Sequence, residues 1–154
     1  MASPLDQIDR RIIDALTRDG RMSMRTLAET LHISRANAYA RVERLKTDGV
    51  IRGFGADIDP AALGFGTAAY VTLNLTQTDW RQIREQLCAL DGIVHIGLVG
   101  GAFDVLLLVR VRDNEDLRRL VLDEIQSIPG VRNTHTLLIF EEPQPVSLAT
   151  GGVR

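Results

Sequence analysis

The chain has 154 residues, of which 45% are hydrophobic and 25% charged, and its formal net charge is −2. This balance is typical of a globular protein with one ordinary domain or two small ones, and it excludes an intrinsically disordered chain. No apolar run reaches the roughly 18–20 residues of a membrane helix, and the N-terminus lacks the layout of a secretory signal, so we expect a cytoplasmic protein with no membrane partner. A single cysteine, Cys88, excludes an intramolecular disulfide and a cysteine-built zinc site, so we expect no metal or cofactor.

Charge is unevenly distributed along the chain. Residues 1–60 have a net charge of +1, and residues 61–154 have a net charge of −3. Between Arg21 and Arg52, seven basic residues stand against three acidic ones, which makes a local net charge of +4. A short basic stretch suits a nucleic-acid partner, although many solvated helix faces have the same composition.

Residues 1–50 have the apolar spacing of three helices. We expect the first helix to begin with Ser3 as its N-cap, and the second and third with Ser23 and Ser34. Gly49 is expected to end the third helix, where a left-handed residue costs least when it is glycine. The residues of the third helix that are expected to face inward are Ala38, Val42 and Leu45.

Two short helices joined by a tight turn, the second of them basic, are typical of a helix-turn-helix DNA-binding domain. A small helical bundle that binds nothing, or that binds another protein, has the same pattern. Residues 51–66 are punctuated by glycine and predict a linker with one short strand. Residues 143–154 contain two prolines and two glycines without periodicity, which predicts a flexible tail.

Residues 67–142 alternate between the patterns of strand and helix. The expected elements are strands over 67–76, 93–99, 103–112 and 131–142, and helices over 79–90 and 115–128, the latter with Asn114 as its N-cap. This βαββαβ order is the ferredoxin-like arrangement. The predicted fold class is therefore α+β, with an N-terminal helix-turn-helix domain, a linking strand and a C-terminal αβ-sandwich.

Two of the expected strands do not alternate apolar and polar residues. Residues 105–109 and 137–140 are apolar throughout, whereas a sheet with helices on one face and water on the other alternates. Two helices can cover only one face, so we expect a second copy of the chain to cover the other. A tail that folds back over this face is the alternative, but residues 143–154 are few and polar. The pattern therefore predicts a homodimer.

Several motifs occur in a fixed order along residues 5–142. They are Leu5-Asp6-Gln7-Ile8-Asp9, Asp19-Gly20-Arg21, Leu27-Ala28, Ser34, Arg41-Val42-Glu43-Arg44-Leu45, Gly49-Val50-Ile51, Gly64, Gly101-Ala102-Phe103-Asp104, Pro129-Gly130-Val131 and Thr134-His135-Thr136. In their order and spacing they resemble the Lrp/AsnC (feast/famine) transcriptional regulators. The resemblance implies a helix-turn-helix that binds double-stranded DNA, and a C-terminal domain that dimerises, binds an amino-acid effector and assembles further, often to octamers.

The outward face of the third helix is the candidate DNA-binding surface. Alanines there allow a close approach to the major groove, asparagine suits adenine, and arginine suits guanine or phosphate. The residues expected to face the groove are Ala36, Asn37, Ala40 and Arg44. Those expected to contact phosphate, on the flanks and at helix N-termini, are Ser23, Arg25, Ser34, Arg35 and Tyr39. Arg41 projects closer to the inward face, so an ion pair within the domain is as good an interpretation as a DNA contact.

The turn at residues 100–102 is the candidate effector site. Its glycines leave backbone N–H groups open to a carboxylate, and Asp104 can pair with an ammonium, which suits a free α-amino acid. The apolar flanks favour an aliphatic or aromatic ligand side chain. The expected lining residues are Leu98, Val99, Gly100, Gly101, Phe103, Asp104, Thr134 and Thr136. The alternative is a plain turn in which the Asp104 carboxylate is hydrogen-bonded within the chain. The family often has polar residues at positions 100 and 102, and this chain has Gly100 and Ala102 there.

Two other classes of function compete with DNA binding. A small αβ-barrel enzyme shares the topology, but it needs a catalytic histidine or acid in an enclosed cavity, and the three histidines are scattered along the chain. A purely oligomerising ligand-binding module would leave the basic helix-turn-helix without a role. The sequence favours a transcriptional regulator, not an enzyme, whose assembly and DNA affinity respond to an amino-acid effector.

Overall fold

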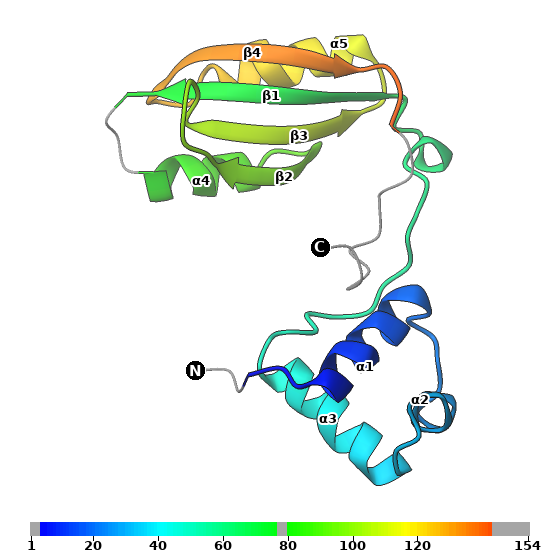
Figure 1. The fold of residues 1–154 in the computed structure, drawn as a ribbon. Coiled ribbons are helices and arrows are strands. Elements are labelled where there is room, and N and C mark those ends of the chain that lie inside the picture. Colours follow the sequence, from blue (N-terminus) through cyan, green and yellow to red (C-terminus); the bar gives the residue numbers. More distant parts are fainter. Residues whose placement is uncertain (1–3, 77–79, 143–154) are drawn as a thin grey trace. The chain divides into compact units, whose positions relative to one another are not determined.

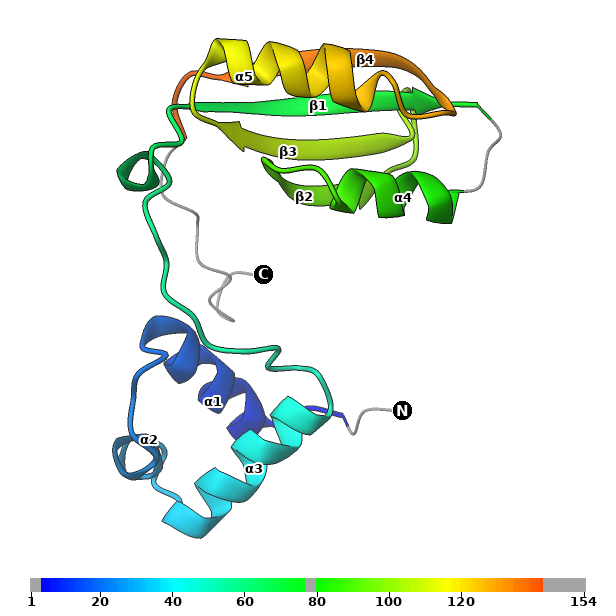
Figure 2. The same ribbon diagram turned by 180° about the vertical axis from the view of Figure 1, so that it is seen from behind.

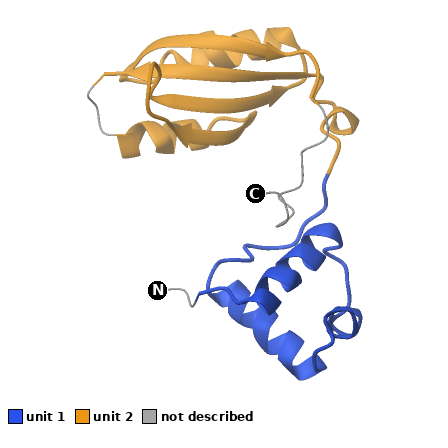
Figure 3. Cartoon of the chain, in the orientation of Figure 1, with its two compact units in different colours: residues 1–57, 144–154 blue, residues 58–143 orange. Residues whose placement is uncertain are grey.

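A computed structural model describes residues 4–76 and 80–142. The described residues divide into two compact units, one within residues 1–57 and one within residues 58–143 (Figure 3). Each unit has a hydrophobic core of its own. The expected tail, residues 143–154, lies outside the described residues.

The first unit contains helices α1 (Gln7–Arg18), α2 (Met24–Leu31) and α3 (Arg35–Thr47) (Figure 1). One face of each helix is apolar, and these faces meet in a core whose buried members are Ile12, Leu16, Leu27, Leu31, Val42 and Leu45. The side chain of Ser23 accepts a hydrogen bond from the Thr26 N–H, and that of Ser34 accepts one from the Asn37 N–H, so both predicted N-caps are confirmed.

The start of α1 differs from the prediction. Its N-cap is Asp6, whose side chain accepts a hydrogen bond from the Asp9 N–H at 2.8 Å, while the Asp9 carboxylate accepts one from the Asp6 N–H at 3.1 Å. This reciprocal pair satisfies two backbone donors, whereas a serine cap satisfies one. The prediction of Ser3 as the cap of this helix is therefore wrong. Gly49, with φ of +71°, follows the end of α3 as predicted.

The linker between the units forms no strand within the described residues 51–66. Its regular element is a short 3₁₀ helix, η1 (Ala61–Leu63), which ends at Gly64 with φ of +88°. The short strand predicted here is therefore not found in the single chain. A strand needs a neighbouring strand to hydrogen-bond with, and among the described residues no strand is paired with this segment.

The second unit contains strands β1 (Thr67–Leu75), β2 (Ile93–Leu98), β3 (Val105–Val111) and β4 (Val131–Ile139), which form an antiparallel sheet in the order β2-β3-β1-β4. Its helices are α4 (Trp80–Cys88) and α5 (Asn114–Arg118), and α5 continues as the π-helical segment η2 (Arg119–Ile125). The predicted βαββαβ order is confirmed. The N-cap of α5 is Asp113, not Asn114, because the Asp113 side chain accepts a hydrogen bond from the Asp116 N–H.

The two faces of the sheet have different surroundings. Helices α4 and α5 lie on one face (Figure 2), and Val105, Leu107 and Val109 of β3 are fully buried beneath them. The alternate residues of β3 point to the opposite face, which no described helix covers. We call this second surface the open face; its residues, set by the strand register, include Tyr70, Thr72, Leu106, Leu108, His135 and Leu137. The helices thus leave an apolar face uncovered, and its covering by a second copy stays a prediction.

Candidate nucleic-acid interface and effector site

One side of α3 is exposed along most of its length. Arg35, Ala36, Asn37, Tyr39 and Ala40 are all exposed, while the opposite side of the helix is buried in the core. The Arg35 guanidinium lies over the Tyr39 ring, 5.9 Å from its centroid, so this tyrosine contributes to the surface and not to the core. The side chains at positions 36 and 40 are short, so the helix backbone can approach a partner closely at the centre of this surface. It has the shape that a helix needs to enter a groove.

Arg44 does not point outward as predicted. Its Nη2 atom lies 2.6 Å from Oδ2 of Asp9 in α1, and its Nη1 atom lies 3.7 Å from Oδ2 of Asp48. The prediction of an outward Arg44 is wrong because Asp9 is only 1% exposed, and a buried carboxylate requires cationic partners. Arg44 lies within reach of it across the α1–α3 contact.

The Asp9 carboxylate is the centre of an ion-pair cluster. Burial by itself would raise the pKa of Asp9, but hydrogen bonds from Arg44, from the Asp6 N–H and from Arg41 together lower it to about 2. Asp9 therefore stays ionised at neutral pH and holds α3 against the start of α1. Because Asp6 is also the N-cap of α1, the cluster joins the helix start to α3.

Arg41 takes part in the same cluster. Its Nη1 atom donates to Oδ2 of Asp6 at 2.6 Å and to Oδ1 of Asp9 at 2.8 Å, and its Nε atom donates to Oδ1 of Asn37 at 2.8 Å. Of the two interpretations of Arg41, the ion pair within the domain is the one that the structure contains. An open cleft of about 510 Å³ lies beside these residues and is also lined by Ala40 and Arg44.

The turn between β2 and β3 is tied to the end of β1. Oδ2 of Asp104 accepts a hydrogen bond from the Leu75 N–H at 2.7 Å, and the Asn74 side-chain amide donates to the Ala102 carbonyl at 2.8 Å. One carboxylate oxygen of Asp104 therefore has a structural role. Gly101 has φ of +127°, a conformation that favours glycine, and a Cβ atom added at Gly100 or Gly101 would meet nothing within 4 Å. The backbone of the turn is open to a ligand.

Thr134 and Thr136 lie on the helix-covered face of the sheet. Thr134 is paired with the fully buried Leu73, and its Oγ1 atom is 2.7 Å from the amide nitrogen of Gln126. Thr136 lines a cleft of about 360 Å³ against α5. The structure therefore does not bring these threonines to the open face beside the turn.

His135 is the residue of β4 that meets the turn segment. It lies between the two threonines in sequence and points to the open face, where its ring centroid is 5.6 Å from that of Phe103. The sequence prediction chose Thr134 and Thr136 because their hydroxyl groups can contact a ligand. The pairing register of β4, however, decides on which face of the sheet each residue lies. Side chains alternate between the two faces along a strand, so the sequence of β4 already indicates that His135 lies on the face opposite to Thr134 and Thr136.

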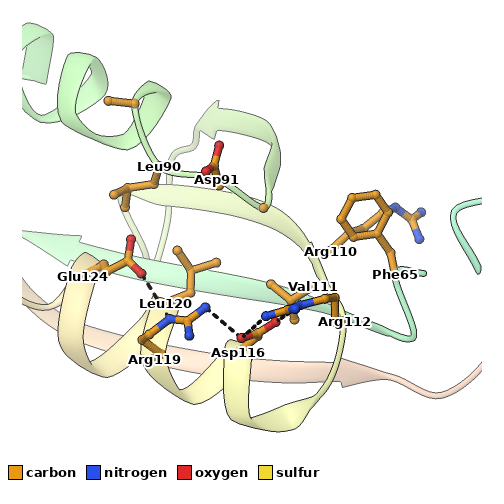
Figure 4. Close-up of a pocket in the computed structure, with 12 residues that line it drawn as sticks. Phe65, Leu90, Asp91, Arg110, Val111, Arg112, Asp116, Arg119, Leu120 and Glu124 are labelled. Carbon is orange, nitrogen blue, oxygen red and sulfur yellow. Dashed lines mark hydrogen bonds and ion pairs between the residues drawn. The ribbon is translucent and has the colours of Figure 1, made fainter. Parts of the chain in front are cut away.

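A further cleft, of about 410 Å³, lies at the other end of β3 (Figure 4). Its polar wall is formed by Asp116 of α5, Arg119 of η2 and Arg112, which follows β3; Nε of Arg112 and Nη2 of Arg119 each lie 2.7 Å from the Asp116 carboxylate. The hydrogen bond from Arg112 is the main cause of a lowered pKa of Asp116. None of the predicted site residues lines this cleft.

Two kinds of feature are absent from the described residues, a metal-binding cluster and a membrane-spanning helix. Within residues 4–76 and 80–142, no three histidine, cysteine, aspartate or glutamate side chains gather as a metal-binding set. No helix in this part of the chain has the length and apolarity to cross a membrane.

Comparison with known proteins identifies the family. Residues 68–147 match the model of the Lrp/AsnC ligand-binding domain, and residues 5–52 match that of a winged helix-turn-helix DNA-binding domain. The chain belongs to the Lrp/AsnC family. The transcriptional regulator AldR of Mycolicibacterium smegmatis is 39% identical over 143 residues, which cover 91% of this chain and 84% of AldR. This Lrp/AsnC protein is thus a transcriptional regulator with a DNA-binding domain and a ligand-binding domain.

Solved structures agree with this assignment. Escherichia coli AsnC superposes with a TM-score of 0.84 at 26% identity, covering 92% of this chain and 95% of that one. The leucine response regulatory protein LrpA of Mycobacterium tuberculosis superposes with a TM-score of 0.79 at 29% identity, covering 90% of this chain and 94% of that one. The predicted family and the α+β fold class of this Lrp/AsnC regulator are confirmed.

Proposed function

We propose that this regulator binds DNA sequence-specifically as a homodimer, and that an α-amino acid at the turn between β2 and β3 adjusts its assembly and its DNA affinity. The observation that carries the DNA part is the exposed row Ala36, Asn37 and Ala40 on a helix whose other side is buried. Such a row offers base contacts at the centre and charged residues at its flanks.

Phosphate contacts are assigned to the residues around this row. Arg25 pairs with Glu29 at 3.0 Å, but both side chains are well exposed, and a surface pair of this kind contributes at most about 1 kcal/mol. A phosphate can therefore replace Glu29 as the partner of Arg25. Arg35 and Tyr39 are exposed on α3 and contact each other, and Ser23 and Ser34 begin the two helices.

The homodimer is assigned to the open face of the sheet. Tyr70 and Leu137 are 39% and 57% exposed there in the single chain, beside the half-buried Leu106 and Leu108. An apolar face of this kind is stabilised by burial against its own copy. Two-fold symmetry then presents two copies of α3, which predicts a roughly palindromic DNA site, and further assembly of dimers, for example to an octamer, follows the family pattern.

The effector is assigned to residues 98–104. The glycine turn offers backbone N–H groups to the ligand carboxylate, and Oδ1 of Asp104, the oxygen not bonded to Leu75, is assigned to accept from the ammonium. Phe103, with His135 beside it, offers an apolar wall to an aliphatic or aromatic ligand side chain. The name of the leucine response regulator among the structural neighbours is consistent with such a ligand. Thr134 and Thr136 are left out of this site because they lie on the other face.

A ligand screen and a binding titration test the proposal together. Thermal unfolding of the full chain is measured with each of the twenty amino acids, and binding to selected duplex DNA is titrated at several salt concentrations with and without any hit. We expect at least one apolar amino acid to raise the melting temperature and to change DNA affinity. Affinity that does not fall with added salt would refute the phosphate contacts.

A further inference from the structure

Three side chains form a hydrogen-bonded chain from the interior of the first unit to the surface of α3. Asp9, 1% exposed, accepts from Nη1 of Arg41 at 2.8 Å, and Nε of Arg41 donates to Oδ1 of Asn37 at 2.8 Å. Asp6 accepts from the same Nη1 atom at 2.6 Å. Arg41 is therefore held at one end by carboxylates and contacts an exposed amide at the other.

The chemistry of arginine decides which way the Asn37 amide faces. A guanidinium has only donors, so the Asn37 atom beside Nε of Arg41 must be the oxygen and not the nitrogen. The amide nitrogen of Asn37 then points away from Arg41. An exposed asparagine normally samples several orientations, and here one of them is selected before any ligand arrives.

From this geometry we infer that Arg41, braced by Asp9, is a positioning residue that orients the Asn37 amide for reading a base. The inference rests on the proposed role of Asn37 in DNA binding. Adenine offers an acceptor and a donor side by side in the major groove, and the amide must present its nitrogen and oxygen in the matching order. The Asn37 oxygen keeps a second lone pair for the base while it accepts from Arg41.

The charge balance argues against Arg41 as a phosphate contact. Its Nη1 atom contacts two carboxylates, those of Asp6 and Asp9, so the cationic charge is already compensated within the domain. Arg44 contacts the same Asp9 at 2.6 Å, but no hydrogen bond joins it to Asn37 among the described residues. Arg44 is therefore the matched control, because its loss disturbs the same carboxylate and leaves the amide contact in place.

The test compares base-pair preferences of variants of the full chain. A binding site is selected with the unmodified protein from a randomised duplex library, and each base pair is then changed in turn. One bidentate contact discriminates between bases by about 5- to 150-fold. We expect Asn37→Ala and Arg41→Met to lose most of that preference at the same base pair. Arg44→Met is expected to lower affinity for all sites by one common factor and to keep the preference.

A second variant covers the case in which Arg41→Met does not fold. Arg41→Lys keeps a cation for Asp6 and Asp9 but has no Nε donor at the position that holds Asn37. It is expected to remain folded by circular dichroism and to lose the same base preference. Because no phosphate contact is removed, the slope of log affinity against log salt should stay that of the unmodified protein.

The outcomes separate this inference from the function on which it rests. If Asn37→Ala loses the preference and the folded Arg41 variants keep it, Arg41 is only a structural ion-pair residue and the inference is overturned. If Asn37→Ala itself keeps every base preference, Asn37 does not read a base, and the proposed DNA-contact surface is wrong together with the inference. A preference lost in Arg44→Met as strongly as in Arg41→Met would also overturn it.

Discussion

Replacing Asp9 by asparagine should destabilise the first unit in a pH-dependent way. The pKa of Asp9 is lowered from 3.8 to about 2 by its arginine and backbone partners, and one unit of pKa corresponds to about 1.4 kcal/mol. The ionised carboxylate therefore stabilises the folded state by about 2 kcal/mol at neutral pH. Because the folded-state pKa lies below the unfolded-state value, this stabilisation is complete above about pH 4 and is lost as the pH falls through about 2.

Urea unfolding at pH 7 and near pH 2 measures this difference. Far-UV circular dichroism follows the helices, and the fluorescence of Trp80, the only tryptophan of the chain, follows the second unit, where it packs against the core. We expect Asp9→Asn to lose about 2 kcal/mol in the dichroism transition at pH 7 and little near pH 2, with the Trp80 transition unchanged.

Glu29→Gln is the matched control, because it makes the same carboxylate-to-amide change in an exposed ion pair of the same unit. Its effect should stay within about 0.5 kcal/mol at both pH values. An equal loss for Asp9→Asn at both pH values would refute the linkage to its ionisation. A shift of the Trp80 transition would show that the change does not act through the α1–α3 contact.

Three more predictions follow from the sheet, the turn and α3. Leu107→Asp places a charge at a fully buried position under the helices and should unfold the second unit. Leu137→Asp, on the open face, should instead give a folded monomer by light scattering and circular dichroism. A folded dimer for Leu137→Asp would contradict the assigned interface. Asp104→Asn keeps an oxygen for the Leu75 N–H but loses the charge, so it should abolish the amino-acid-induced rise in melting temperature and leave basal DNA binding near normal; an undiminished ligand response would exclude the ammonium contact. Arg35→Ala should weaken binding about equally for all DNA sequences and reduce the salt slope by about 1, and a selective loss at one base pair would show that Arg35 reads a base instead.

The sequence alone determined the features that depend on neighbouring residues. Ser23 and Ser34 were predictable as N-caps because a hydroxyl at the start of a helix can accept a hydrogen bond from the N–H three residues ahead. The same rule misplaced the other two caps, where Asp6 and Asp113 cap the helices instead of Ser3 and Asn114. The inward positions Ala38, Val42 and Leu45 followed from helical periodicity, and the order of strands and helices from the same kind of pattern. The motifs of the Lrp/AsnC family, with their spacing, indicated the class of function.

Tertiary structure decided where polar side chains point. Arg44 points to Asp9 and not outward because an ion pair with this buried carboxylate is more favourable than exposure of the guanidinium to water. Asp9 belongs to α1, so no local pattern in α3 could reveal it. His135 and not Thr134 met the turn segment because the register of β4 against β1 assigns each residue to a face. The linking segment, residues 51–66, forms no strand because a strand has to hydrogen-bond with a second strand, and the residues of the segment cannot specify that partner by themselves. Local propensity acts within a few residues, whereas buried charge, register and strand pairing are settled between segments that are distant along the chain.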